Sequence, residues 1–204
     1  MSTKLTVAIS AGGKSSRMGT DKAFVEMAGK PLIAHMLERV ADLGQQDTVI
    51  ITNRPTDYAH LGLPLYGDVI AEKGALGGIY SALHHSQTEY TLVLACDMPF
   101  VNPPLLQHMI GLCQADPTLD VVVPRVHDYP EGLHAVYHQR CLAPIRSRLE
   151  ADKLKVIGFY PDVKVRYLEE PEWRPFDPQG LTFFDLDTPE ELEIARRMLG
   201  EHNE

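Results

Sequence analysis

The sequence predicts an α/β protein, in which helices cover both faces of a mostly parallel sheet to give three layers, α/β/α. Short apolar, β-branched runs alternate with helical patterns through the first half of the chain, which is typical of parallel strands joined by crossover helices. The chain has 204 residues, of which 44% are hydrophobic and 23% charged. This is enough for one substantial core, so we expect a single domain over residues 1–204.

The elements of the first half follow from local patterns. Residues 5–9 are apolar and β-branched and stop before two glycines, which predicts a buried strand. A helix is expected over 31–43, because Pro31 suits a first turn, apolar residues recur at helical spacing and Gly44 can close it. Residues 47–51 and 91–95 read as further buried strands. A helix over 79–85 is expected between them, after a run of glycines.

Helix caps mark the second half. Asn102 caps a helix expected over 103–113, and Thr188 caps a last helix in which Pro189 is the first residue and Glu191 completes a capping box. Strands are expected at 121–123, 133–137, 163–168 and 181–184, with a short helix over 144–150 and a Pro- and Glu-rich loop before residue 181.

Charge and composition exclude several classes of protein. The formal net charge is −9, whereas sequence-independent nucleic-acid binding needs a basic face. No apolar stretch approaches the length of a membrane span, and the first apolar run is too short for a signal peptide. The three cysteines are far apart and form no CxxC motif. We therefore expect a cytoplasmic protein with no nucleic-acid and no membrane partner.

The loop after the first strand concentrates positive charge in this acidic chain. The stretch "AISAGGKSSRMGTDKAF" combines glycines with Lys14, Arg17 and Lys22. Glycines expose backbone N–H groups, arginine can grip two phosphate oxygens and lysine acts as a point charge, so the loop is a candidate phosphate cradle. A solvated turn is the alternative. The loop lacks the glycine spacing of a Walker A motif and of the dinucleotide motif GxGxxG.

Acidic and amide side chains follow the other predicted strands. Because ligands in open α/β sheets bind beyond the carboxyl ends of the strands, the loop, Asn53, Asp68 and Asp97 should share one edge. Magnesium prefers few protein carboxylates together with substrate phosphates and water. Asp97 at a strand end facing a cationic loop therefore suits nucleotide-dependent phosphoryl chemistry, with a plain surface aspartate as the alternative.

Five motifs in order resemble the MobA-type molybdenum cofactor guanylyltransferases. "AGGKSSRMGTDK" followed by "GKPLIAHMLERV" resembles the opening signature of that family, and "GALGGIYSAL" its second glycine-rich segment. "LACDMPFV" is similar to its metal-binding strand end, "GLHAVYHQR" to a later strand and "FFDLDTPEEL" to its terminal motif.

This resemblance implies a Rossmann-like nucleotidyltransferase sheet with a few antiparallel strands in the C-terminal half. It implies that a molybdopterin phosphate oxygen attacks the α-phosphorus of GTP and that pyrophosphate leaves, with Mg²⁺ as cofactor and transient contact with other proteins of the cofactor pathway. The implied catalytic residues are Arg17, Lys22 and Asp97, with Asp97 as the metal ligand. The implied nucleotide-binding residues are Ser10, Ala11, Gly12, Gly13, Lys22, Asn53, Asp68, Gly77, Gly78 and Asp97.

The sequence departs from the family pattern in two places. Asp185 and Asp187 stand where the family usually has asparagines, and Gly132 stands where a proline is expected. The acidic tail is similar to that of the cytidylyltransferases of the same pathway, and Asp185 or Asp187 could add a second metal carboxylate or favour the helix dipole. The rival functions are a molybdopterin cytidylyltransferase, another small-phosphate nucleotidyltransferase and a non-catalytic nucleotide-binding regulatory protein.

Three other residues invite interpretation. Alternation along the strand predicts that Cys96 points into the core when Asp97 points out. No cysteine or acidic partner at ligand spacing supports a zinc site at His134 and His138. His134 is instead kept as a candidate phosphate contact lining the cleft. Trp173 either covers a pterin or holds its loop against the protein, and the sequence does not choose between these roles.

Overall fold

The protein is built on one central sheet. The computed structural model describes residues 4–12 and 22–200. The strands lie in the order β10-β7-β9-β6-β1-β4-β5, and β8 pairs with β7. They are β1 (Leu5–Ser10), β4 (Asp47–Ile51), β5 (Leu65–Tyr66), β6 (Tyr90–Ala95), β7 (Val121–Val126), β8 (Tyr129–Pro130), β9 (His134–His138) and β10 (Val165–Leu168).

Most of these strands run in one direction. β1 is parallel to both β4 and β6, and β10 is parallel to β7. β9 is antiparallel to its neighbours β6 and β7, and β8 is antiparallel to β7. The prediction of a mostly parallel sheet with a few antiparallel strands in the C-terminal half is therefore confirmed.

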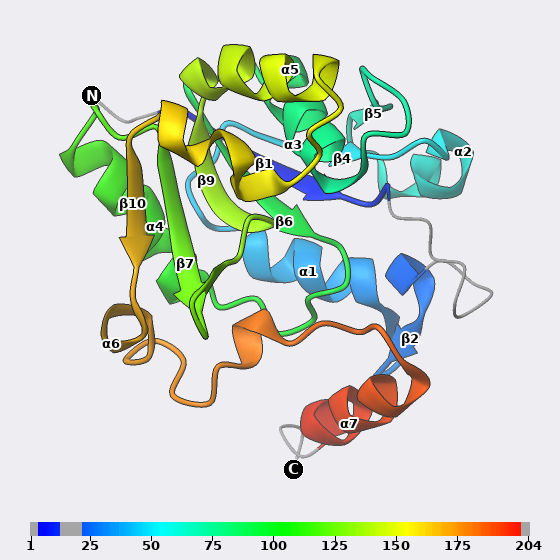
Figure 1. The fold of residues 1–204 in the computed structure, drawn as a ribbon. Coiled ribbons are helices and arrows are strands. Elements are labelled where there is room, and N and C mark those ends of the chain that lie inside the picture. The colour runs from blue at the N-terminus through cyan, green and yellow to red at the C-terminus, as the bar shows by residue number, and fades with distance from the viewer. Residues whose placement is uncertain (1–3, 13–21, 201–204) are drawn as a thin grey trace.

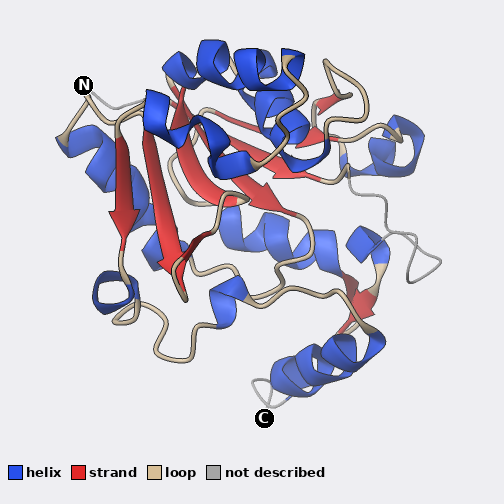
Figure 2. Ribbon diagram, viewed as in Figure 1, coloured by secondary structure: helices blue, strands red, loops and turns tan. Residues whose placement is uncertain are grey.

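Helices cover both faces of the sheet, which confirms the three layers (Figure 1; Figure 2). α3 (Gly74–His85) and α5 (Leu142–Glu150) lie on one face, where their apolar residues pack on Ala8, Val93 and Val121. α1 (Leu32–Val40) and α4 (Pro103–Ala115) lie on the other face and pack on Val7, Leu92 and Val122. Buried strands with apolar residues on both faces are what such a sandwich requires.

A smaller unit lies beside the sheet. The two-stranded ribbon of β2 (Glu26–Met27) and β3 (Lys30–Pro31) follows the short η1 turn (Lys22–Phe24). α7 (Pro189–Gly200) packs on this ribbon through a separate apolar cluster that includes Met27, Leu32 and Leu186. Figure 1 shows α7 next to β2, away from the other helices. Among the described residues, no helix has the length and apolar character to cross a membrane.

The local predictions have mixed outcomes. β4 has the predicted bounds, and Asn102 caps α4 by accepting a hydrogen bond from the Leu105 N–H at 2.9 Å. The capping box of α7 is present, since the Thr188 hydroxyl accepts from the Glu191 N–H and the Glu191 carboxylate accepts from the Thr188 N–H. α3 begins at Gly74, five residues earlier than expected, so the glycine run is helical. The prediction of one domain stays a prediction.

Two predictions between β10 and α7 are wrong. Residues 181–183 form a 3-10 turn, η5 (Leu181–Phe183), and not a strand. The Thr182 N–H donates to the Asp177 carboxylate and the Thr182 hydroxyl accepts from the Asn102 N–H, so these groups bond to loops and not to a strand. The expected loop contains a short helix, α6 (Glu170–Trp173), which has its own capping box between Glu169 and Glu172.

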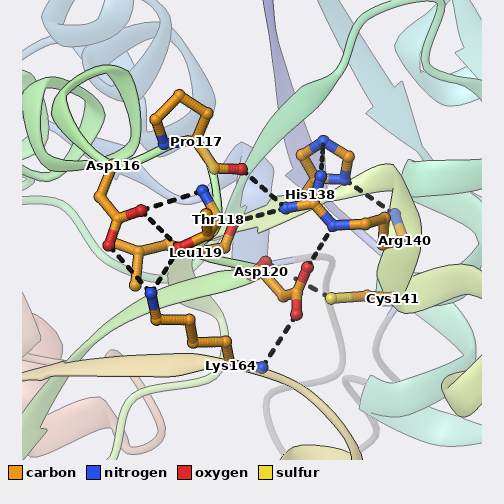
Figure 3. Close-up of polar contacts among 9 residues, drawn as sticks. All are labelled: Asp116, Pro117, Thr118, Leu119, Asp120, His138, Arg140, Cys141 and Lys164. Atoms are coloured by element: carbon orange, nitrogen blue, oxygen red, sulfur yellow. Dashed lines mark hydrogen bonds and ion pairs between the residues drawn. The ribbon is translucent and has the colours of Figure 1, made fainter.

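A polar network closes the amino edge of the sheet near β7 (Figure 3). The Asp120 carboxylate accepts from Arg140 Nε at 2.5 Å and from the Lys164 backbone N–H at 2.8 Å. Arg140 also donates to the carbonyls of Pro117 and Leu119, both at 3.0 Å. One carboxylate and one guanidinium thereby connect the start of β7, the end of β9 and the start of β10, away from the edge where the parallel strands end.

Candidate active site

The carboxyl ends of β1, β4 and β6 lie side by side. Ser10, the last residue of β1, pairs in register with Ile51 of β4 and with Ala95 of β6. Beyond them, the Ala11 N–H donates to the Ile51 carbonyl at 2.8 Å, and the Cys96 N–H donates to the Ser10 carbonyl at 3.1 Å. The segments that follow these three strands are therefore neighbours, as the sequence predicts.

The predicted phosphate loop is described only in part. Ser10, Ala11 and Gly12 lie at this edge, with Ala11 buried and Gly12 exposed. Gly13 and Arg17 lie outside the described residues, so their roles stay predictions.

Two of the predicted nucleotide-binding residues contact each other. Asn53 follows β4 and Asp68 follows β5, and the pairing of these strands brings the two side chains together. Asn53 Nδ2 donates to Asp68 Oδ2 at 2.7 Å, and the Asp68 N–H donates to Asn53 Oδ1 at 2.9 Å. The reciprocal pair fixes the orientation of the amide at the edge of the sheet and leaves one oxygen of the carboxylate for other donors.

Gly77 and Gly78 are buried in the first turns of α3 and do not form a loop. A Cβ added to Gly78 would lie 3.1 Å from the Ser10 hydroxyl oxygen. The lack of a side chain at Gly78 therefore lets the beginning of α3 approach the end of β1. The N-terminal turn of a helix has unpaired backbone N–H groups, which favour anions at such a position.

A cation and two carboxylates form the centre of the site. Asp97 follows β6, Lys22 begins η1 and Asp187 precedes α7, so three distant parts of the chain meet here. Lys22 Nζ lies 2.5 Å from Asp187 Oδ1 and 3.6 Å from Asp97 Oδ2. The side chain of Lys22 is 14% exposed and that of Asp97 is 26% exposed, whereas that of Asp187 is 57% exposed, so the cluster is partly buried and opens to water on the Asp187 side.

Burial and mutual charge shift the pKa values in this cluster. Burial lowers the pKa of Lys22, but the hydrogen bond to Asp187 and the charge of Asp97 outweigh it, so that pKa is raised above its usual value. Burial raises the pKa of Asp97 and outweighs the opposing effect of Lys22. Partial burial raises the pKa of Asp185 to about 7, together with the negative charges of Asp97 and Glu131. Negative charge is crowded at this edge, and a positive partner is favoured there.

The tail of the chain is fastened to the end of β6. The Leu186 N–H donates to the Asp97 carbonyl at 3.0 Å, and the Leu186 side chain is buried beside α7. This link brings the two acidic residues that flank Leu186 to the end of β6. The acidic tail therefore lies next to Asp97, and a role of Asp185 or Asp187 in binding a metal stays a prediction.

The donor set at this position fits a divalent cation of the magnesium kind. The ligands on offer are carboxylate oxygens, which Mg²⁺ prefers, and the Lys22 ammonium already shows that a positive charge is stabilised beside them. The described residues contain no group of three or more acidic, histidine or cysteine side chains that could hold a metal by themselves. A magnesium ion here would therefore depend on substrate phosphates and water for its other ligands.

Three other predicted residues are now placed. His134 is fully buried, with its ring 5.2 Å from that of Phe183, so it does not line the cleft as predicted. Neither of its ring nitrogens has a hydrogen-bond partner in the part of the chain that the structure describes, and burial lowers its pKa to about 4. Trp173 is buried and donates from Nε1 to the Arg125 carbonyl at 3.0 Å, so it holds its loop in place. Cys96 is half-buried and packs against the core on the α1 and α4 side.

One acidic residue at this edge is absent from the sequence prediction. Glu131 follows β8, is half-buried and lies within electrostatic reach of Asp185. β8 contains only two residues, which is too short for a periodic pattern, so nothing in the sequence marks its end.

The fold and this cluster define a nucleotide-binding protein of the α/β class, with a glycine-containing turn and acidic and cationic groups beyond the parallel strands. The comparisons with known proteins are more specific. A family model described as "MobA-like NTP transferase domain" matches residues 7–161. The chain belongs to this family.

Relatives with similar sequences carry consistent names. The chain is 33% identical to a "Probable molybdenum cofactor guanylyltransferase" of Natranaerobius thermophilus, with 98% of each chain covered. It is 34% identical to a "Molybdenum cofactor guanylyltransferase" of Desulfosudis oleivorans, with 94% of each covered. Among solved structures, the molybdopterin-guanine dinucleotide biosynthesis protein A of Archaeoglobus fulgidus has a TM-score of 0.83 at 28% identity and covers 96% of this chain and 99% of its own.

Proposed function

We propose that this protein is a molybdenum cofactor guanylyltransferase, which transfers GMP from GTP to the phosphate of molybdopterin and releases pyrophosphate. The observation that carries the proposal is the meeting of Lys22, Asp97 and Asp187 at the carboxyl edge of the sheet, beside the turn that follows β1. Family membership and the names of the relatives support the same activity.

The nucleotide would bind over the ends of β1, β4 and β5. Backbone N–H groups near Gly12 and at the start of α3 would contact the phosphates, and Lys22 would add a point charge. The Asn53–Asp68 pair lies beyond β4 and β5 with a carboxylate oxygen available for donors of the guanosine portion. By the family motif, Arg17 would neutralise further phosphate charge.

The reaction is a displacement at the α-phosphorus of GTP. A phosphate oxygen of molybdopterin forms the new P–O bond, the bond between the α-phosphorus and its bridging oxygen breaks, and the electron pair leaves with pyrophosphate. No covalent intermediate on the protein is needed, because positioning and charge neutralisation carry such reactions. With nucleotide bound, Lys22 would pair with the triphosphate in place of the two carboxylates that it contacts in this structure.

Asp97 would hold Mg²⁺, with Asp185 or Asp187 as a second carboxylate. When bound, the ion would neutralise the charge that develops on the phosphate oxygens. The carbonyl of Asp97 is fixed by the Leu186 N–H, which sets the backbone from which the carboxylate projects. Because the proposed reaction consumes GTP, we also propose a cytoplasmic location.

The decisive experiment is a nucleotide panel. The full chain is incubated with molybdopterin, magnesium and each of GTP, CTP, ATP and UTP, and pyrophosphate and the dinucleotide product are measured. Release with GTP and a product containing GMP are expected. Pyrophosphate release with CTP alone would show that the protein is a cytidylyltransferase and not a guanylyltransferase. The acidic residues at 185 and 187 are similar to the tail motif of the cytidylyltransferases. Binding of nucleotide without turnover would favour a regulatory protein.

A further inference from the structure

Glu131 is held firmly at the edge of the sheet where the proposed reaction takes place. Its backbone N–H donates to the Pro124 carbonyl at 2.9 Å, and its carbonyl accepts from the His134 N–H at 2.9 Å. Next to it, the Leu133 carbonyl accepts from the N–H of Ala95, two residues before Asp97. The residue is therefore fixed between β7 and β9, on the side of β6 that faces away from β1.

The carboxylate of Glu131 has no protein partner among residues 4–12 and 22–200. It is half-buried, yet it makes neither a hydrogen bond nor an ion pair there, and burial raises its pKa above the usual value. Other acidic side chains with similar burial are paired: Asp120 accepts from Arg140, and Asp177 accepts from the Thr182 N–H. Glu131 is not among the residues whose side-chain oxygens are both buried and unpartnered, so its carboxylate, although partly desolvated, stays open to a ligand with hydrogen-bond donors.

The position of Glu131 indicates which ligand would supply these donors. The proposed nucleotide side, with Asn53 and Asp68, lies beyond β4 and β5, on one side of β6. Glu131 lies on the other side of β6, within electrostatic reach of Asp185. The two substrates of a nucleotidyl transfer must meet at Asp97, so Glu131 belongs to the side of the acceptor.

The chemistry of a pterin matches a carboxylate that has no partner within the described part of the chain. The pyrimidine ring of a pterin presents N3–H and a 2-amino group side by side, which are two parallel donors. A carboxylate offers two acceptor oxygens in the same spacing and can accept both hydrogen bonds at once. We propose that the Glu131 carboxylate binds this edge of the pterin in the acceptor, an inference that rests on the proposed function.

The test uses the full chain and two probe molecules as competitors of molybdopterin in GMP transfer. One probe is pterin, and the other is lumazine, in which an oxygen replaces the 2-amino group. The wild type should bind pterin more tightly than lumazine, because the second oxygen of Glu131 would face an acceptor in lumazine. Pterin fluorescence quenching gives the affinity independently of turnover.

Three variants separate this role from a structural one. Glu131→Gln should weaken pterin binding about ten- to a hundredfold and remove the preference over lumazine, with the KM for GTP unchanged. Glu131→Asp should recover part of the preference. Glu150→Gln, at an exposed carboxylate on α5 that pairs with Arg146, is the matched control and should behave as the wild type.

Each outcome decides the proposal. A wild type without preference for pterin, or a Glu131→Gln variant that keeps the preference, overturns the role of Glu131 while leaving the guanylyltransferase activity standing. A wild type that transfers no GMP to molybdopterin overturns the proposed function, and this inference with it.

Discussion

Replacing His134 with leucine should change how the stability of this protein depends on pH. His134 is fully buried on β9, with its ring beside that of Phe183, and neither ring nitrogen has a partner among the described residues. A charged imidazolium in this position would lose water and gain no acceptor. The fold therefore holds the ring neutral, and burial lowers its pKa to about 4.

The magnitude follows from the two pKa values. The unfolded chain takes up the proton near the usual value of 6.5, whereas the folded chain takes it up only near 4. The unfolded state therefore binds more protons between these values, and the stability of the wild type falls as the pH falls. Relative to high pH, where His134 is neutral in both states, linkage lowers the free energy of unfolding by about 0.2 kcal/mol at pH 7, about 2 kcal/mol at pH 5 and about 3 kcal/mol at pH 4.

The assay is denaturant unfolding of both proteins at pH 7, 6, 5 and 4. His134→Leu should gain stability relative to the wild type by about 3 kcal/mol on going from pH 7 to pH 4. Val136→Ala, at a buried neighbour on the same strand, is the control, since it carries no titratable group and its effect should not change with pH. A difference between His134→Leu and the wild type that stays constant over this range would refute the reasoning.

Three further predictions concern the site and one cap. Asp97→Asn should reduce pyrophosphate release about a hundredfold or more with little loss of stability, and turnover near the wild-type level would contradict the metal role. Lys22→Ala should weaken GTP binding about ten- to a hundredfold in a titration, because a charge-assisted contact to phosphate is lost; unchanged affinity would argue against the phosphate cradle. Asn102→Ala should lower the free energy of unfolding by about 1 kcal/mol through loss of the α4 cap, and an unchanged denaturation midpoint would show the cap to be dispensable.

The parts of the fold that could be predicted from the sequence are those encoded locally. β4 and the capped helices α4 and α7 depend on apolar runs and on cap residues within a few positions. The 181–184 segment could not be predicted in this way. Its apolar residues are typical of a strand, but its hydrogen bonds go to Asp177, five residues earlier, and to Asn102, 80 residues away. The reversed direction of β9 likewise depends on its pairing with β6 and β7 and not on its own residues.

The positions in the candidate site that could be predicted from the sequence are those that directly follow a buried strand. Asp97 lies beyond a buried strand, and its position follows from that strand alone. The contact between Asn53 and Asp68 depends on the pairing of β4 with β5, a strand of two residues that carries no periodic signal. The ion pair between Lys22 and Asp187 joins residues 165 positions apart. Glu131 is positioned by β8, which has two residues, as β5 does. Tertiary pairing, and not local sequence, assembles these parts.

The ion pair of Lys22 with Asp187 also has a consequence for synthesis of the chain. Lys22 lies shortly before the β2–β3 ribbon, and Asp187 lies shortly before α7. α7 packs on the ribbon, and its Arg196 donates hydrogen bonds to the Glu26 carbonyl of β2. During translation, most of the sheet can form before α7 has left the ribosome. Lys22 then still lacks its tail partner. Lys22 therefore meets Asp187 only after nearly the whole chain has been made, so this ion pair joins an early and a late part of the polypeptide as folding is completed.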